Sequence, residues 1–165
     1  MSDDTPEALS DLASRLFDAA RAGNVALLEE ALAHGLPADL RNDKGDSLLM
    51  LAAYHGQDAA VRLLLRHGAN PDLPNDRGQL PLAGAVFKDA TAVVEALLAH
   101  GARVDAAGPD GRTPLMLAAL FNRDIVLRKL LDAGADRNAT DASGATAAQM
   151  ARAMGARNTL ALLEE

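Results

Sequence analysis

The sequence predicts an all-α protein in which short helix pairs stack into a solenoid. The string GRTPLMLAA at Gly111–Ala119 has related copies that begin at Gly45, Gly78 and Gly144, so the copies recur at one constant interval. A second glycine ladder keeps the same interval, in His34-Gly35, His67-Gly68, His100-Gly101 and Ala133-Gly134. Apolar residues make up 49% of the chain and aromatic residues only 2%, which suits thin helices packed closely. Two ladders with one period indicate an array of repeats.

The first helix is expected to begin with Thr5 as its N-cap and Pro6 at its first position, and to end near Gly23. Its inward face would carry Leu9, Leu12, Leu16, Ala19 and Ala20. A second, shorter helix would follow, with inward positions at Val25, Leu28, Ala31 and Leu32. We interpret residues 12–41 as a first repeat that acts as an N-terminal cap, and residues 1–4 as a frayed start.

Three middle repeats share one layout, over residues 45–74, 78–107 and 111–140. Each follows a loop rich in Asn, Asp, Pro and Gly, which are residue types that favour tight turns. A short inner helix comes next. Ser47 or Thr113 is its expected cap, and Pro81 or Pro114 lies in its first turn. A sharp turn is expected at the equivalent positions Gly56, Asp89 and Asn122. A longer outer helix completes each repeat.

Apolar columns connect the outer helices, because their inward positions superpose when the chain is shifted by the repeat interval. The first column is Leu28, Val61, Val94, Leu127 and Leu160. The second is Ala31, Leu64, Leu97, Leu130 and Leu163, and the third is Leu32, Leu65, Leu98, Leu131 and finally Glu164. Gln149 and Arg152 also break apolar columns of the inner helices. Solenoid ends need polar faces. Residues 144–165 are therefore expected to form a C-terminal cap, which would complete a single domain of residues 1–165.

These motifs resemble those of the ankyrin-repeat family over about residues 8–165. Gly111–Ala119 matches the family string G-x-T-P-L-H-x-A-A except at the histidine, and Gly68–Asp72 and Gly134–Asn138 match its G-A-D-x-N loop. The histidine is replaced in every repeat, by Met50, Ala83, Met116 and Gln149. The resemblance implies a gently curved stack with projecting hairpin-like loops. It also implies protein binding through the loop tips and the exposed ridge of the inner helices.

Composition narrows the classes of partner. The net charge of −7 disfavours a nucleic acid and makes a basic or neutral protein surface the more natural counterpart. The chain has no cysteine, no run of the ~18 apolar residues that span a bilayer, and no signal-like start. Abundant Ala and Arg with only three Lys suggest a GC-rich bacterial genome. We expect a cytoplasmic monomer with a protein partner, and no nucleic acid or membrane partner.

Neither a metal site nor an active site is expected. His34, His67 and His100 recur in register, but equivalent residues of stacked helices lie roughly 8–10 Å apart. Zinc ligands must all lie within ~2 Å of one ion. The histidines instead suit helix C-termini, where imidazoles complement the helix dipole. No nucleophile elbow, phosphate-binding loop or dinucleotide-binding string is present, so the chain is predicted not to be an enzyme and to need no cofactor.

The few aromatic side chains mark the candidate partner-binding surface. Tyr54 and Phe87 share one repeat position and Phe121 lies one residue beyond it, each just before a turn between helices. We define the ridge as Tyr54, His55, Phe87, Lys88, Leu120 and Phe121. Aromatic anchors with a polar rim are typical of interface hot spots. The alternative is that these rings fill gaps between helices. Loop-tip candidates are Arg41, Asp43, Lys44, Asp76, Arg77, Gln79, Asp110 and Arg112.

Gly84 interrupts a column of larger side chains, whose other members are Leu51, Leu117 and Met150. It lies three residues before Phe87 and therefore on the same helical face. Phe87 folds back over Gly84 in one interpretation, which is the one we expect. In the other, the repeat has a small notch at Gly84. Such a notch would be the site of an alternative function, the binding of a small molecule or peptide.

Overall fold

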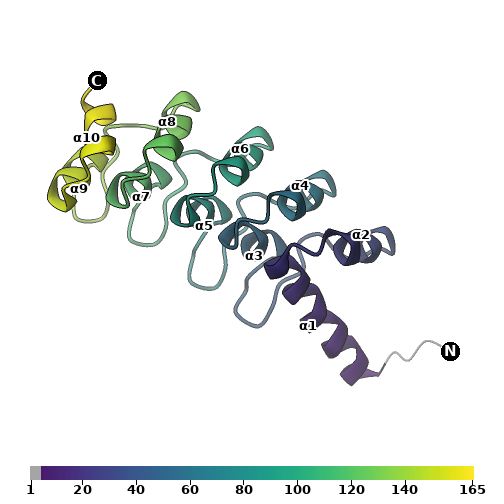
Figure 1. Cartoon of the computed structure of the whole chain (residues 1–165). Coiled ribbons are helices and arrows are strands. Elements are labelled where there is room, and N and C mark those ends of the chain that lie inside the picture. The colour runs from purple at the N-terminus through teal and green to yellow at the C-terminus, as the bar shows by residue number, and fades with distance from the viewer. Residues whose placement is uncertain (1–4) are drawn as a thin grey trace.

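Five helix pairs lie side by side in chain order in the computed structural model, which describes residues 5–165 (Figure 1). The helices are α1 (Pro6–Ala22), α2 (Val25–Ala33), α3 (Leu48–Tyr54), α4 (Asp58–Arg66), α5 (Pro81–Lys88), α6 (Thr91–Ala99), α7 (Pro114–Leu120), α8 (Asp124–Asp132), α9 (Ala147–Met154) and α10 (Arg157–Glu164). The prediction of an all-α solenoid is confirmed. The expectation of a frayed start concerns residues 1–4, which lie outside the described residues.

The helices form two layers. The inner helices α1, α3, α5, α7 and α9 each pack on the next along the stack, and the outer helices α2, α4, α6, α8 and α10 do the same. Long loops connect each outer helix to the next inner helix and project to one side of the row (Figure 1). The projecting loops and the inner helices therefore border the same side of the molecule.

Helix starts and turns follow the local chemistry of the sequence. The hydroxyl of Ser47 accepts a hydrogen bond from the Met50 N–H at 3.0 Å, and the hydroxyl of Thr113 accepts one from the Met116 N–H at 3.3 Å. Helix α5 has Leu80 at this position and no side-chain cap, but Pro81 occupies its first turn. The expected turns after α3, α5 and α7 are confirmed, because their turn residues are left-handed: Gly56 (φ 70°), Asp89 (φ 60°) and Asn122 (φ 55°).

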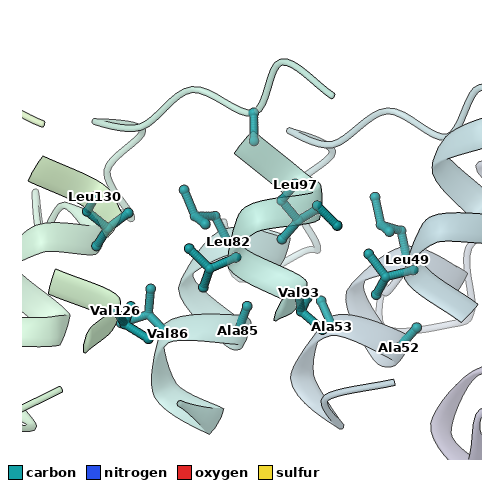
Figure 2. Close-up of a cluster of buried hydrophobic side chains, with 14 of the residues drawn as sticks. Leu49, Ala52, Ala53, Leu82, Ala85, Val86, Val93, Leu97, Val126 and Leu130 are labelled. Atoms are coloured by element: carbon teal, nitrogen blue, oxygen red, sulfur yellow. The ribbon is translucent and has the colours of Figure 1, made fainter. Parts of the chain in front are cut away.

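The core is a continuous layer of small aliphatic side chains between the inner and the outer helices. Leucine, valine and alanine side chains of neighbouring helices meet there (Figure 2). Val61, Val94 and Leu127 of the first predicted column are fully buried, and so are Leu97 and Leu130 of the second. Each fully buried side chain of this size stabilises the fold by about 1.5–3 kcal/mol. The stability is thus distributed along the stack.

The first half of α1 departs from the prediction. Leu9 and Leu12 were expected to face the core, but their exposed fractions are 54% and 42%, so that expectation is wrong. Helix α1 has 17 residues whereas the neighbouring α3 has seven, and the N-terminal part of α1 extends beyond the stack (Figure 1). Only the second half, with Leu16 and the unanticipated Phe17, is buried.

Aspartates connect successive loops with the same offset. The carboxylates of Asp39, Asp72 and Asp105 each accept the backbone N–H of the residue 31 positions further on. These bonds are 2.8, 3.1 and 3.0 Å long. The hairpin-like character of the projecting loops appears as isolated bridges between Arg41 and Ser47 and between Thr140 and Thr146. The loops are consequently held in register with the helices they connect.

The last helix pair presents polar side chains where the middle repeats have apolar ones. Gln149, Arg152 and Glu164 are all exposed, as predicted from the broken columns. Arg152 and Glu164 form an ion pair at 2.6 Å. Arg137 donates to the carbonyl of Leu162 at 2.9 Å, which ties the preceding loop to the end of α10.

Candidate partner-binding surface

Three aromatic rings form a row across the ends of three inner helices. Tyr54 ends α3, Phe87 lies in the last turn of α5 and Phe121 caps α7. The Tyr54 and Phe87 rings stack with centroids 5.7 Å apart and planes 10° apart, and Phe121 meets Phe87 edge-on at 5.4 Å. Their exposed fractions are nevertheless 46%, 46% and 38%. The rings therefore pack on one another and still present a large apolar surface to solvent.

The other ridge residues also lie at the ends of the inner helices. His55 meets the Tyr54 ring edge-on at 5.5 Å, and both His55 and Lys88 are exposed. Leu120 is half-buried against the core. Arg123 donates to the Phe87 carbonyl at 3.2 Å, which secures the end of α5 from the next helix pair.

The space beside Gly84 is occupied by a different ring from the one expected. A Cβ added to Gly84 would lie 3.4 Å from the Cα of Tyr54 and 3.5 Å from its Cβ and Cδ2. Phe87 stacks on the Tyr54 ring, so the closest neighbour of Gly84 is Tyr54 of the preceding repeat and not Phe87 as expected. The physical reason is that α3 and α5 pack in direct contact, which brings the preceding repeat closer to Gly84 than its own Phe87.

A groove of about 500 Å³ opens between the ridge and the projecting loops. Apolar and small residues of the inner helices and their caps line one side of it: Met50, Tyr54, Leu80, Ala83, Gly84, Phe87, Leu117 and Phe121. Loop residues line the other side: Arg77, Gln79, Gly108, Pro109, Asp110 and Arg112. The structure therefore brings the three ridge aromatics together with four of the predicted loop-tip residues.

Hydrogen bonds hold the loop wall of the groove in place. The Asn75 side chain donates to Gln79 at 2.9 Å and accepts the Gln79 backbone N–H at 2.9 Å. The Arg112 Nε lies 3.5 Å from a carboxylate oxygen of Asp110 and 4.0 Å from one of Asp141. The charge of Arg112 is thus balanced by two nearby carboxylates, one of which lines the groove.

The remaining loop-tip candidates do not line the groove: three of them belong to the preceding loop, and Asp76 lies in the same loop as Arg77. Arg41 donates to the Pro74 carbonyl at 3.0 Å and lies 3.5 Å from the Asp76 carboxylate. It therefore connects two loops of the structure itself. Asp43 and Lys44 are exposed at the tip of that loop. Any role for these side chains in partner binding would lie at the edge of the surface.

Sequence reasoning missed Ala83 and Gly108 as lining residues. A comparison of equivalent repeat positions contains the signal that could have found them. Position 83 is Met50 in the preceding repeat and Met116 in the following one. Position 108 is occupied in the other three loops by Asn42, Asn75 and Asp141. The groove lies where repeat positions lose side chains that their counterparts carry.

The residues whose pKa is shifted in the folded protein lie away from the apolar part of the groove. The pKa of Asp141 is lowered by a hydrogen bond from the Ser143 hydroxyl at 2.7 Å and by the backbone N–H of Ala145 at 2.9 Å. On the outer helices, a hydrogen bond from Lys129 at 2.8 Å lowers the pKa of Glu95 and raises that of Lys129. The hydrogen bonds to Asp141 act within a loop, and the ion pair of Glu95 and Lys129 connects two outer helices.

The in-register histidines lie at helix ends, as predicted. His34 and His100 cap α2 and α6, and their Nδ1 atoms donate to the carbonyls of Glu30 and Ala96 at 2.8 and 2.9 Å. Within residues 5–165, no three His, Cys, Asp or Glu side chains are grouped so that they could hold a metal ion. The helices of this described range are also too short or too polar to cross a membrane.

The stacked helix pairs with projecting loops define an ankyrin-repeat protein, and comparison with known families agrees. A family profile of three ankyrin repeats matches residues 16–108, more than half of the chain, and a profile of many ankyrin repeats matches residues 97–151. The chain belongs to the ankyrin-repeat family. It is similar to a Pseudomonas aeruginosa protein named as ankyrin repeat protein PA3287, with 67% identity over 42 residues. That alignment covers 26% of this chain and only 25% of the relative.

Proposed function

We propose that this protein is a non-catalytic module that binds a partner protein through the ridge and the loop tips, as an adaptor, inhibitor or scaffold. Ankyrin repeats generally mediate interactions between proteins, and the family is typically non-catalytic. The observation that carries the proposal is the exposed row of Tyr54, Phe87 and Phe121 on the wall of the groove. The chain has only four aromatic residues, and three of them lie on this surface.

The geometry of the rings suits an interface anchor. Large aromatic side chains supply much contact area with few rotatable bonds, and their stacking restricts those bonds before a partner arrives. A row that is already ordered loses less conformational entropy on binding. The polar neighbours His55 and Lys88 provide a rim at the edge of the row.

Single alanine substitutions separate an interface from core packing. Tyr54→Ala, Phe87→Ala and Phe121→Ala should each lower the free energy of unfolding by no more than about 2 kcal/mol, because half-exposed rings bury little area. Phe17 is the matched control, since it is the buried aromatic with 7% exposure. Phe17→Ala should cost ~3–5 kcal/mol. Chemical denaturation measures all four. If all three ridge variants are as unstable as Phe17→Ala, the rings act in core packing and not as interface anchors.

Affinity capture from the native organism, read by mass spectrometry, tests the binding itself. The wild-type protein should retain a specific polypeptide. Each ridge truncation should weaken that complex about tenfold or more, and the triple variant should abolish it. A partner retained equally by the wild-type protein and the folded triple variant would refute the role of the ridge.

A second candidate function is the binding of a small molecule or free peptide near Gly84. The groove volume of about 500 Å³ lies within the range of ligand pockets, and its wall is largely apolar with a few polar groups. A thermal shift with metabolites in the absence of any protein partner would support this function. A protein that responds only to a polypeptide would exclude it.

A further inference from the structure

The groove lies where one region of the stack lacks side chains that the equivalent positions of other repeats have. Leu51 and Leu117 occupy the position of Gly84 in the adjacent repeats, and both Gly84 and Leu117 line the groove. Ala83 is likewise smaller than its counterparts, and Gly108 has no side chain at all. Because these side chains are absent, the groove has space for a side chain from outside, beside Tyr54, Phe87 and Phe121. The shape and lining therefore favour a bulky apolar side chain.

The charge of the groove is opposite to that of the chain. Its charged lining residues are Arg77, Asp110 and Arg112, with a net charge of one positive, whereas the whole chain carries −7. Asp110 and Asp141 already lie beside Arg112. Among residues 5–165, no carboxylate forms an ion pair with Arg77, and its neighbour Asp76 pairs with Arg41. Arg77 is thus the uncompensated charge at the groove.

Local charge governs what the groove accepts. The Debye length is about 8 Å at physiological ionic strength, so exposed acidic side chains farther away than this are largely screened. A carboxylate within the groove would instead contact the guanidinium directly. Guanidinium groups bind carboxylates through charge-assisted hydrogen bonds, which are stronger than neutral ones. The expectation of a basic or neutral partner, made from net charge, therefore does not extend to this part of the surface.

We propose that the groove binds a linear segment of the partner protein in which a bulky apolar side chain lies next to an acidic residue. The apolar side chain occupies the groove next to the aromatic row, and the carboxylate binds Arg77. This inference rests on the proposed function, because it specifies the chemistry of the partner at the same surface. A peptide is favoured over a rigid folded surface because the groove is bounded on both sides, by inner helices and by loops.

The test is selection of random peptides displayed on phage against the full chain. Enriched peptides should carry an aromatic or branched aliphatic residue next to Asp or Glu. Their affinity is then measured by fluorescence anisotropy with the labelled synthetic peptide. Arg77→Gln should weaken binding about tenfold or more, as expected for loss of a hydrogen bond to a charged group. Gly84→Leu should also abolish binding, because leucine restores the side chain that the adjacent repeats have.

Matched controls identify the cause of each effect. Arg128→Gln removes the same charge from an exposed position of α8 and should change the affinity by less than about twofold. Replacing the acidic residue of the peptide by its amide should remove the difference between wild type and Arg77→Gln, because the cycle isolates the pair. Gly84→Leu is interpreted only if its melting temperature stays near that of the wild type. If that variant unfolds, Arg77→Gln and the peptide amide still decide.

Several results would overturn the inference. These are enrichment of basic peptides or of apolar peptides without an acid, no enrichment at all, or unchanged affinity in Arg77→Gln. Phenylacetate that displaces the peptide at the concentration where the peptide itself binds would indicate a metabolite site instead. Capture of a partner that depends on the ridge but not on Arg77 would leave the proposed function intact and refute this segment chemistry alone.

Discussion

At the scale of single residues, Tyr54 links two repeats and the solvent. Its backbone and ring lie against Gly84 of the next inner helix, and its ring stacks on Phe87. A stacked aromatic pair contributes about 0.5–1.5 kcal/mol beyond the area that it buries. The stacking energy is smaller than the stabilisation that a fully buried aromatic ring provides. Tyr54 therefore contributes to the packing of the repeats although it is half exposed. The same residue can therefore pack on its neighbours and remain available to a partner.

Gly84→Ala should leave stability unchanged or raise it slightly. The new Cβ would lie at ordinary contact distance from Tyr54, at 3.4–3.5 Å, and would not need positive φ. Glycine in a helix interior is about 1 kcal/mol less favourable than alanine, so the gain should be up to about that amount. Urea denaturation measures it. A clear loss of stability would mean that α3 and α5 approach more closely than this distance allows.

At the scale of structural elements, three of the four projecting loops share one internal support. Side-chain oxygens of Asn42, Asn75 and Asp141 each accept two backbone N–H groups of their own loop. These bonds order the loops without a strand pairing of more than one bridge. The third loop has Gly108 at this position and uses Asp110 to accept the Arg112 N–H instead. One of the two loops that border the groove is therefore built differently from the other three.

Asp141→Asn should make stability less sensitive to acid. The pKa of Asp141 is lowered in the folded protein, so its stabilisation is present above the unfolded pKa and is lost as pH falls through the folded value. Asparagine accepts the same hydrogen bonds, as Asn42 and Asn75 do, and does not titrate in this range. Denaturation curves between about pH 2 and pH 7 measure the difference.

Asp43→Asn is the control for that experiment, because Asp43 is an exposed carboxylate at a loop tip. Both variants remove one loop carboxylate, so a difference in acid dependence between them reports on the hydrogen bonds to Asp141. If Asp141→Asn shows the same loss of stability on acidification as Asp43→Asn, the hydrogen bonds to Asp141 do not stabilise its ionised form.

At the scale of the whole molecule, each helix pair is stabilised by its neighbours. The core runs through the whole stack, but each helix packs mainly on helices of its own repeat and of the adjacent repeats. The stability of such an array approximates a sum of terms within repeats and between adjacent repeats. Removal of one end pair therefore eliminates a complete interface and exposes the next.

Deletion of residues 144–165 should cause aggregation or a large fall in melting temperature. Helices α9 and α10 cover α7 and α8, where Leu130 is fully buried and Leu131 half-buried. Light scattering and thermal melts measure the outcome. A truncated protein that remains monomeric with an unchanged melting temperature would show that this pair is not a stabilising cap.

A second truncated variant with Leu131→Glu tests the reason. Glu164 occupies the equivalent position of the last repeat and is exposed. Introducing a charge at Leu131 should reduce aggregation if the newly exposed apolar column causes it. Equal aggregation of both truncated proteins would point to a different exposed surface.

The sequence by itself determined most of the fold and the position of the three ridge aromatics at the ends of the inner helices. Local signals predicted helix starts at Ser47 and Thr113 and the turns at Asp89 and Asn122, because capping and left-handed turns depend on nearby residues. Long-range contacts were also accessible, since stacked repeats convert them into one constant offset. The column through Val61, Val94 and Leu127 is the result.

Only the tertiary structure decided how unequal elements meet. Leu9 and Leu12 fit a helical apolar face, yet they are exposed because α3 is too short to cover them. The partner of Gly84 proved to be Tyr54 of the preceding repeat, and not the adjacent Phe87. A comparison of equivalent repeat positions shows where a side chain is lost, but it does not show which neighbour comes closest to that position. The space that a lost side chain leaves, and the charge of Arg77 beside that space, depend on the distances between helices and loops in three dimensions.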